Sequence, residues 1–140
     1  MADSDSYYNA TRSQGLQMID WTTIRNFSQD EFDSPDFPGS GSNMQSDFVE
    51  TLDTLRDYCG FPIYVTSGFR TATHNASVGG KPNSAHTRGW AADLYVGSDA
   101  ERYAILDAAI ELGFQRIGIG STFVHLDLDP SLPQHVVWVY

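Results

Sequence analysis

The amino-acid sequence predicts an α+β domain, in which a small and mostly antiparallel sheet packs against helices. Two segments show the apolar spacing of amphipathic helices, and short β-prone segments lie between and after them. The last three β-prone segments follow one another with tight connections, which is typical of antiparallel strands. The chain has 140 residues, 41% of them hydrophobic, so it is long enough for one domain with one core.

Both helices are predicted from their apolar positions and their ends. The first, at 45–58, ends at Gly60, and its apolar stripe consists of Phe48, Leu52, Leu55 and Cys59. The second starts with the capping box Ser98-Asp99-Ala100-Glu101 and ends at Gly113. Its apolar face is expected to contain Leu106, Ala109 and Ile110.

The remaining segments divide into strands, loops and an N-terminal arm. We expect strands at 63–66, 90–96, 116–119, 123–128 and 136–140. A long polar loop at 71–89 separates the first two and contains a helical turn near His74. Residues 1–20 are expected to form a loosely held arm, and residues 21–140 the domain. The side chains expected to pin the start of the domain to its core are Trp21, Ile24, Phe27 and Phe32.

Charge and cysteine content argue against several classes of protein. The formal net charge is −10, which argues against unaided binding to nucleic acid or to an anionic membrane. No apolar run approaches the ~20 residues that cross a bilayer, and the first residues show no secretory signal. We therefore expect a soluble monomer made in the cytoplasm, which reaches an external target only after release. Cys59 is the single cysteine, so we expect a core thiol and no disulfide within the chain.

Residues 123–129 alternate between apolar and polar side chains, as a half-buried strand does. The polar face holds His125, Asp127 and Asp129, and we expect solvent or a ligand against it. Calcium binding by the two aspartates is one alternative. Such a site needs about six to eight oxygen ligands, and the spacing of an EF-hand loop is missing here.

Two histidines and an aspartate are spaced so that a metal ion could bind between them. Asp93 lies on the polar face of the strand at 90–96, and pairing of this strand with 123–129 would bring Asp93 to His125. His86 lies in the loop just before Asp93. Three protein ligands with a fourth position open to water are typical of catalytic zinc. The alternative is an ordinary hydrogen-bonded pair of histidine and carboxylate.

Several motifs resemble the zinc D-Ala-D-Ala carboxypeptidase and endopeptidase family, peptidase family M15, whose fold the hedgehog signalling domain shares. The similarity covers roughly residues 22–140 and rests on Thr66-Ser67-Gly68-Phe69-Arg70, His74-Asn75, Val78-Gly79-Gly80, Ser84-x-His86-x-x-Gly89-x-Ala91-x-Asp93 and Phe123-Val124-His125-Leu126-Asp127. The resemblance implies that His86, Asp93 and His125 bind Zn²⁺. It also implies that Arg70 contacts the carbonyl or carboxylate of the substrate and that Ser84 lies in the substrate site.

One position departs from the family pattern. Many members have a catalytic Glu three residues before the last histidine, where this chain has Thr122. Asp127 is the nearest carboxylate, two residues after His125, and we assign it provisionally as the general base. The alternative role for Asp127 is to orient His125 through a hydrogen bond.

The resemblance implies a zinc metallopeptidase that hydrolyses peptide bonds in the peptide stems of bacterial peptidoglycan. The bond cut could be the D-Ala-D-Ala bond, as in a D,D-carboxypeptidase, or the L-Ala-D-Glu bond, as in an endopeptidase. The compact size would fit a phage endolysin. A non-catalytic zinc-binding module that holds a peptide or cell-wall partner is the alternative, favoured by the missing Glu. Aromatic side chains that could line a groove, or pack in the core instead, are Trp90, Tyr95 and Trp138.

Overall fold

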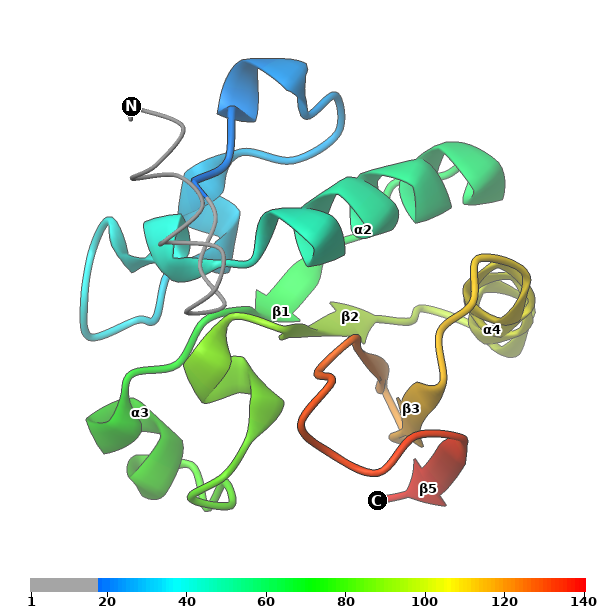
Figure 1. The fold of residues 1–140 in the computed structure, drawn as a ribbon. Coiled ribbons are helices and arrows are strands. Elements are labelled where there is room, and N and C mark those ends of the chain that lie inside the picture. The colour runs from blue at the N-terminus through cyan, green and yellow to red at the C-terminus, as the bar shows by residue number, and fades with distance from the viewer. Residues whose placement is uncertain (1–17) are drawn as a thin grey trace.

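The computed structural model describes residues 18–140, and a five-stranded sheet forms its centre (Figure 1). Residues 1–17, most of the predicted N-terminal arm, lie outside the described part. The spatial order of the strands is β1-β2-β4-β3-β5. The strands are β1 Val65–Ser67, β2 Ala91–Tyr95, β3 Arg116–Ile119, β4 Phe123–Asp127 and β5 Val136–Val139.

The sheet is mostly antiparallel, as predicted. β2 pairs antiparallel with both β1 and β4, and β4 pairs antiparallel with β3. Only the edge strand β5 is parallel to its neighbour β3. A parallel neighbour needs a longer connection than a hairpin, and the segment between β4 and β5 provides it. The carbonyl of Pro133 in that segment accepts a hydrogen bond from Arg116 on β3.

Two helices cover the apolar face of the sheet. Helix α2 spans Ser46–Cys59 and helix α4 spans Asp99–Glu111, and both contribute to the single core cluster (Figure 1). The predicted stripe of α2 is fully buried at Phe48, Leu52 and Leu55, and half-buried at Cys59. Gly60 ends the helix in the left-handed conformation, with φ 75°.

The predicted apolar face of α4 is partly wrong. Ile105, Ala108 and Ala109 are buried, whereas Ile110 is 62% exposed. A helix with small alanines can approach the sheet closely along a narrow stripe, so Ile110 falls outside the contact although it is apolar. The predicted cap at Ser98 is confirmed, since its side chain accepts a hydrogen bond from the backbone N–H of Glu101. The reciprocal bond of the capping box differs, because the Glu101 side chain accepts from the backbone N–H of Gly97.

The segment before α2 packs on the core through short helical turns. These turns are η1 Trp21–Thr23, η2 Gln29–Phe32 and η3 Ser40–Asn43. Phe27 and Phe32 are buried, Ile24 is 9% exposed and Trp21 packs against the core, as the sequence predicted. The buried carboxylate of Asp53 on α2 accepts hydrogen bonds from the backbone N–H groups of Arg25 and Asn26, at 2.9 Å each.

The long polar segment between β1 and β2 contains two short helical elements, α3 Ala72–Ser77 and η4 Ala85–Arg88. The expected helical turn near His74 is therefore α3. The second element, η4, was not predicted, and it carries His86. Among residues 18–140, no helix is both long enough and apolar enough to cross a membrane.

Candidate metal centre

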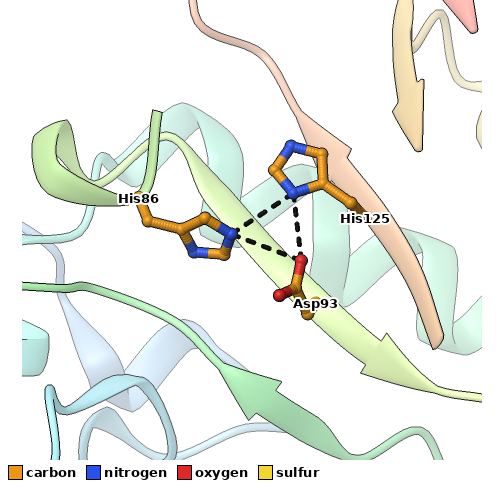
Figure 2. Close-up of side chains that lie close together, drawn as sticks. All are labelled: His86, Asp93 and His125. Carbon is orange, nitrogen blue, oxygen red and sulfur yellow. Dashed lines mark hydrogen bonds and ion pairs between the residues drawn. The ribbon is translucent and has the colours of Figure 1, made fainter. Parts of the chain in front are cut away.

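The pairing of β2 with β4 places Asp93 directly opposite His125. Both side chains point away from the helices, because their neighbours Ala92, Leu94 and Val124 are in the core. Facing residues in an antiparallel pair have side chains about 4.5–5.5 Å apart at Cβ, so an imidazole and a carboxylate can touch. The Nδ1 atom of His125 lies 3.0 Å from the Oδ1 atom of Asp93 (Figure 2).

His86 reaches the same point from the turn η4. The Ser84 side chain caps this turn by accepting a hydrogen bond from the His86 backbone N–H. Gly89 ends the turn with φ 77°, and a Cβ there would lie 2.2 Å from the carbonyl oxygen of Asn43. Only glycine fits both the left-handed conformation and this close approach. The backbone N–H of Gln45, at the start of α2, donates to the carbonyl of Gly89 and fixes the turn against the helix.

The three side chains converge on one point. The Nε2 atom of His86 lies 3.2 Å from Nδ1 of His125 and 3.3 Å from Oδ1 of Asp93 (Figure 2). Each imidazole has an acceptor for its other nitrogen: Nδ1 of His86 lies 2.8 Å from the carbonyl oxygen of Gly68, and Nε2 of His125 lies 2.7 Å from Oδ2 of Asp127. These acceptors favour the tautomers whose N–H groups point outward, which leaves the nitrogen lone pairs facing Asp93.

The pKa directions reflect the burial of this cluster. Burial disfavours the charged imidazole and holds the pKa of His86 below its ordinary value, although Asp93 opposes the shift. The same burial acts on His125, but its hydrogen bonds to Asp127 and Asp93 outweigh it and raise the pKa. For Asp93, burial acts in the opposite direction and would raise the pKa of the carboxyl group. Hydrogen bonds with His125 and His86 nevertheless hold this pKa well below its usual range.

This donor set fits a metal ion. In these tautomers of the neutral imidazoles, two nitrogen lone pairs and a carboxylate oxygen face one another, and such atoms repel unless a proton or a metal cation lies among them. Ligands at about 2.0–2.2 Å from a tetrahedral zinc would lie roughly 3.3–3.6 Å apart. The observed separations of 3.0–3.3 Å are close to that range. Within residues 18–140, His86, Asp93 and His125 are the group whose ligand atoms are arranged to hold a metal ion.

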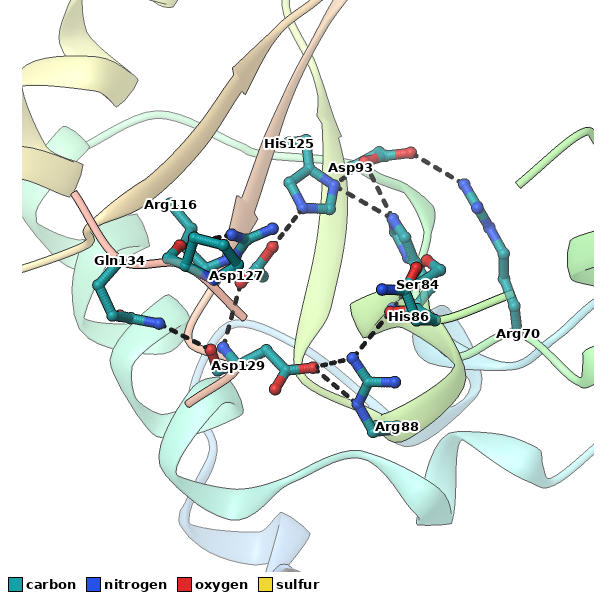
Figure 3. Close-up of polar contacts among 12 residues, drawn as sticks. Arg70, Ser84, His86, Arg88, Asp93, Arg116, His125, Asp127, Asp129 and Gln134 are labelled. Carbon is teal, nitrogen blue, oxygen red and sulfur yellow. Dashed lines mark hydrogen bonds and ion pairs between the residues drawn. The ribbon is translucent and has the colours of Figure 1, made fainter. Parts of the chain in front are cut away.

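Arg70 lies beside the cluster and is largely buried. Its Nη2 atom lies 3.4 Å from Oδ2 of Asp93, the oxygen that faces away from the histidines (Figure 3). Nε donates to the Ser67 hydroxyl and Nη1 to the side-chain oxygen of Asn75. A guanidinium has five N–H groups. Three are used in these contacts, so two have no partner among the described residues.

The polar face of β4, expected to meet solvent or a ligand, is largely buried, and His125 and Asp127 on this face line a cleft. His125, Asp127 and Asp129 are each at most 5% exposed. Two arginines cover the carboxylates: Arg116 donates from Nε to Asp127 at 2.7 Å, and Arg88 donates from Nε to Asp129 at 2.8 Å (Figure 3). Because both carboxylates are ion-paired, they do not form the open set of oxygen ligands that calcium requires.

The cluster opens into a cleft of about 750 Å³. Arg70, Ser84 and the three candidate ligands line it, and Trp138 and Tyr140 contribute aromatic surface. Of the three aromatic residues considered for a groove, Trp138 lines the cleft, whereas Trp90 packs against the core and Tyr95 lies outside the lining. Thr122 also lies outside the lining. Among the described residues, the carboxylates that line the cleft are Asp93 and Asp127.

Sequence reasoning missed three residues of this site. Asn75 is buried and ties Arg70 to the loop that follows, by donating to the carbonyl of Lys81. Tyr140 borders the cleft, and Arg116 covers Asp127. Arg116 had a usable signal: the tight connection at 120–122 fixes the register of β3 on β4, and counting back from it sets Arg116 opposite Asp127. Asn75 lies in the segment His74-Asn75 that resembles the family, but its contact with Arg70 depends on how the loop folds.

The fold and the site together define an α+β protein with a candidate metal centre on the polar face of its sheet. Comparison with known families identifies it further. The profile of the Peptidase M15 family matches residues 24–127, and the chain belongs to that family. The chain is also similar to the zinc D-Ala-D-Ala carboxypeptidase of Streptomyces albus G. The two are 42% identical over 74 residues, which is 53% of this chain and 25% of that protein.

Proposed function

We propose that the protein is a zinc-dependent peptidase that hydrolyses peptide bonds in the stems of bacterial peptidoglycan. The observation that carries this proposal is the cluster of His86, Asp93 and His125, whose metal-binding atoms face one another in an open cleft. Membership of the Peptidase M15 family supports it. The similarity to a protein named zinc D-Ala-D-Ala carboxypeptidase supports the choice of metal and substrate class.

His86, Asp93 and His125 would hold the zinc ion. When bound, zinc lowers the pKa of a water molecule and polarises a carbonyl group. The chain itself supplies the remaining functions. The two N–H groups of Arg70 that have no partner among the described residues can hold the oxygen of the scissile carbonyl, and Ser84 borders the same cleft. The aromatic surface of Trp138 and Tyr140 can shelter the substrate from water.

Asp127 is better suited to orient His125 than to act as the general base. Its Oδ2 atom lies 2.7 Å from Nε2 of His125, the ring nitrogen that faces away from His86 and Asp93. Its Oδ1 atom accepts from Arg116 at 2.7 Å and from the backbone N–H of Asp129 at 3.1 Å. Both oxygens are engaged and the side chain is buried. A base must reach the attacking water, so of the two roles predicted for Asp127 we propose the orienting one.

A non-catalytic binding module is the second candidate. Its specific support is Thr122, which occupies the position where many relatives have a catalytic Glu and which lies outside the cleft lining among the described residues. Such a module would bind zinc and muropeptides but release them unchanged.

The activity itself is tested with purified peptidoglycan fragments. We expect the zinc-loaded protein to cleave soluble muropeptides, and mass spectrometry of the products will identify the bond. Loss of a single terminal alanine indicates a carboxypeptidase, whereas separation of the stem from the glycan-linked L-Ala indicates an endopeptidase. Intact muropeptides that nevertheless bind the zinc-loaded protein would support the binding module instead.

Metal binding is tested with His86→Ala and His125→Ala. We expect the wild-type protein to bind a single zinc ion per chain and each variant to lose it, because two ligands cannot hold the ion tightly. Metal analysis after dialysis gives the occupancy, and circular dichroism checks that the variants still fold. Full zinc occupancy in both variants would remove these residues from the metal site.

Arg70 is expected to act on the substrate. Arg70→Ala should lower kcat/KM by about 10²–10³-fold, the usual effect of removing one donor to the developing negative charge. Zinc occupancy should remain, because the three ligands are intact. Arg70→Lys should restore activity only in part, since an ammonium group cannot reproduce the planar fork. Steady-state kinetics and metal analysis on the same samples check both expectations, and wild-type kinetics in Arg70→Ala would contradict them.

Asp127→Asn separates the two roles of this carboxylate. If Asp127 orients His125, we expect zinc affinity to fall by about 10–100-fold. If it is the general base, zinc affinity stays normal while turnover at saturating zinc falls by about 10²–10⁴-fold. Competition with a chelator measures the affinity, and assays with excess zinc measure the turnover. A variant normal in both would exclude each role.

A further inference from the structure

Arg116 is held from three sides next to the candidate metal centre. Its Nε atom donates to Oδ1 of Asp127 at 2.7 Å (Figure 3). Its Nη1 atom donates to the carbonyl of Pro133 at 2.6 Å. The guanidinium also lies over the ring of Trp138, 5.1 Å from the centroid. The side chain is 11% exposed and lines the cleft, and two of its five N–H groups are used in these bonds.

The contact with Arg116 restricts the way Asp127 can turn. A free carboxylate can rotate and offer either oxygen to His125, or swing away from the ring. Here one oxygen is fixed by Arg116 and by the backbone N–H of Asp129, and the other oxygen then meets Nε2 of His125. A series of direct contacts therefore runs from Arg116 through Asp127 to His125, and the Nδ1 atom of His125 faces Asp93 and His86.

Trp138 lies beside two members of this series, His125 and Arg116. Its ring lies 5.3 Å from the ring of His125, and Arg116 lies over it. Gly118 makes this possible: it stands between His125 and Trp138 in the sheet, and a Cβ there would lie 2.6 Å from Nε1 of Trp138. Without a side chain at 118, the indole can lie over the strand between His125 and Arg116.

We propose that Arg116 is a positioning residue for the metal centre, which acts by fixing Asp127 and thereby the ring orientation and tautomer of His125. This proposal rests on the proposed function, since it requires that His125 bind zinc. A second reading is that Arg116 only stabilises the fold by pairing with a buried carboxylate. Both readings predict a loss of stability on substitution, so stability alone cannot separate them.

The chain contains a matched control for that comparison. Arg88 pairs with Asp129, the next carboxylate on the same side of the chain, at 2.8 Å from Nε. Asp129 is as buried as Asp127, but its other oxygen accepts from Ser131 and not from a histidine. Arg88 lies in η4 with His86, but the bonds of its side chain within the described residues go to Asp129 and to the carbonyl of Asn83. Arg88→Gln therefore removes the same kind of ion pair without removing a side-chain bond to a candidate ligand or to Asp127.

The experiment measures zinc affinity by chelator competition for the full chain and for Arg116→Gln, Arg88→Gln, Asp127→Asn and the double variant Arg116→Gln/Asp127→Asn. We expect Arg116→Gln to weaken zinc binding by about 10-fold, at the lower end of the effect of residues that orient a metal ligand. Arg88→Gln should bind zinc as the wild type does, although both variants should lower Tm by several degrees. The double variant should bind zinc no more weakly than Asp127→Asn, because Arg116 acts through Asp127.

A spectroscopic measurement and a second variant complete the experiment. In the zinc-loaded protein, the Nε2 proton of His125 should give a protected imidazole signal in the NMR spectrum of the wild type and Arg88→Gln, and a weakened one in Arg116→Gln. If Arg116→Gln does not fold, Arg116→Lys takes its place. It keeps the charge but cannot bond both Asp127 and the Pro133 carbonyl with the same geometry, so zinc affinity should fall by a smaller factor.

The proposal is overturned if Arg116→Gln, or Arg116→Lys in its place, binds zinc as the wild type does. It is equally overturned if Arg88→Gln loses as much affinity, or if the effects of Arg116→Gln and Asp127→Asn simply add. Failure of the wild-type protein to bind zinc would instead overturn the proposed function, and this inference with it.

Discussion

The antiparallel register between β2 and β4 is the constraint on which the site depends. It sets Asp93 opposite His125. Side chains in a strand alternate between faces, so a shift of either strand by one residue would turn its ligand toward the apolar core and separate the two residues. The core prevents that shift, because Ala92, Leu94 and Val124 fill the space beneath the helices. The hydrophobic packing on one face therefore fixes the polar chemistry on the other.

Burial of charge is the second constraint. The protein is strongly acidic overall, yet it buries three carboxylates around the site. Isolated buried carboxylates are costly, and each one here has an arginine as partner. These pairs are Arg70 with Asp93, Arg116 with Asp127, and Arg88 with Asp129. The pairs of Arg116 and Arg88 also fix the path of the chain after β4, because Arg116 donates to the carbonyl of Pro133 and Asp129 accepts from Ser131.

The cleft has a floor of hydrogen-bonded strands and walls that come from separate parts of the chain. The floor consists of strand residues and the turn η4, which backbone hydrogen bonds join to the segment of Arg70 and to the start of α2. The loop after α3 forms one wall, and Asn75 ties that loop to Arg70. The edge strand β5 forms another wall through Trp138 and Tyr140. The candidate metal ligands therefore lie on strands and η4, whereas loop and edge segments supply the surface around them.

Much of this arrangement was already determined by the sequence. Periodic apolar spacing predicted both helices and the α+β class, and alternation in 123–129 predicted that His125 and Asp127 share a face, because these patterns depend only on local geometry. The motif around His86 and Asp93 predicted the candidate cluster. Other features were decided only by the tertiary structure. The parallel placement of β5, the burial of the polar face of β4, the exposure of Ile110 and the contacts of Arg116 and Asn75 all depend on which distant segments meet. Local residue patterns do not contain that information, because it arises from packing of the whole chain around one core.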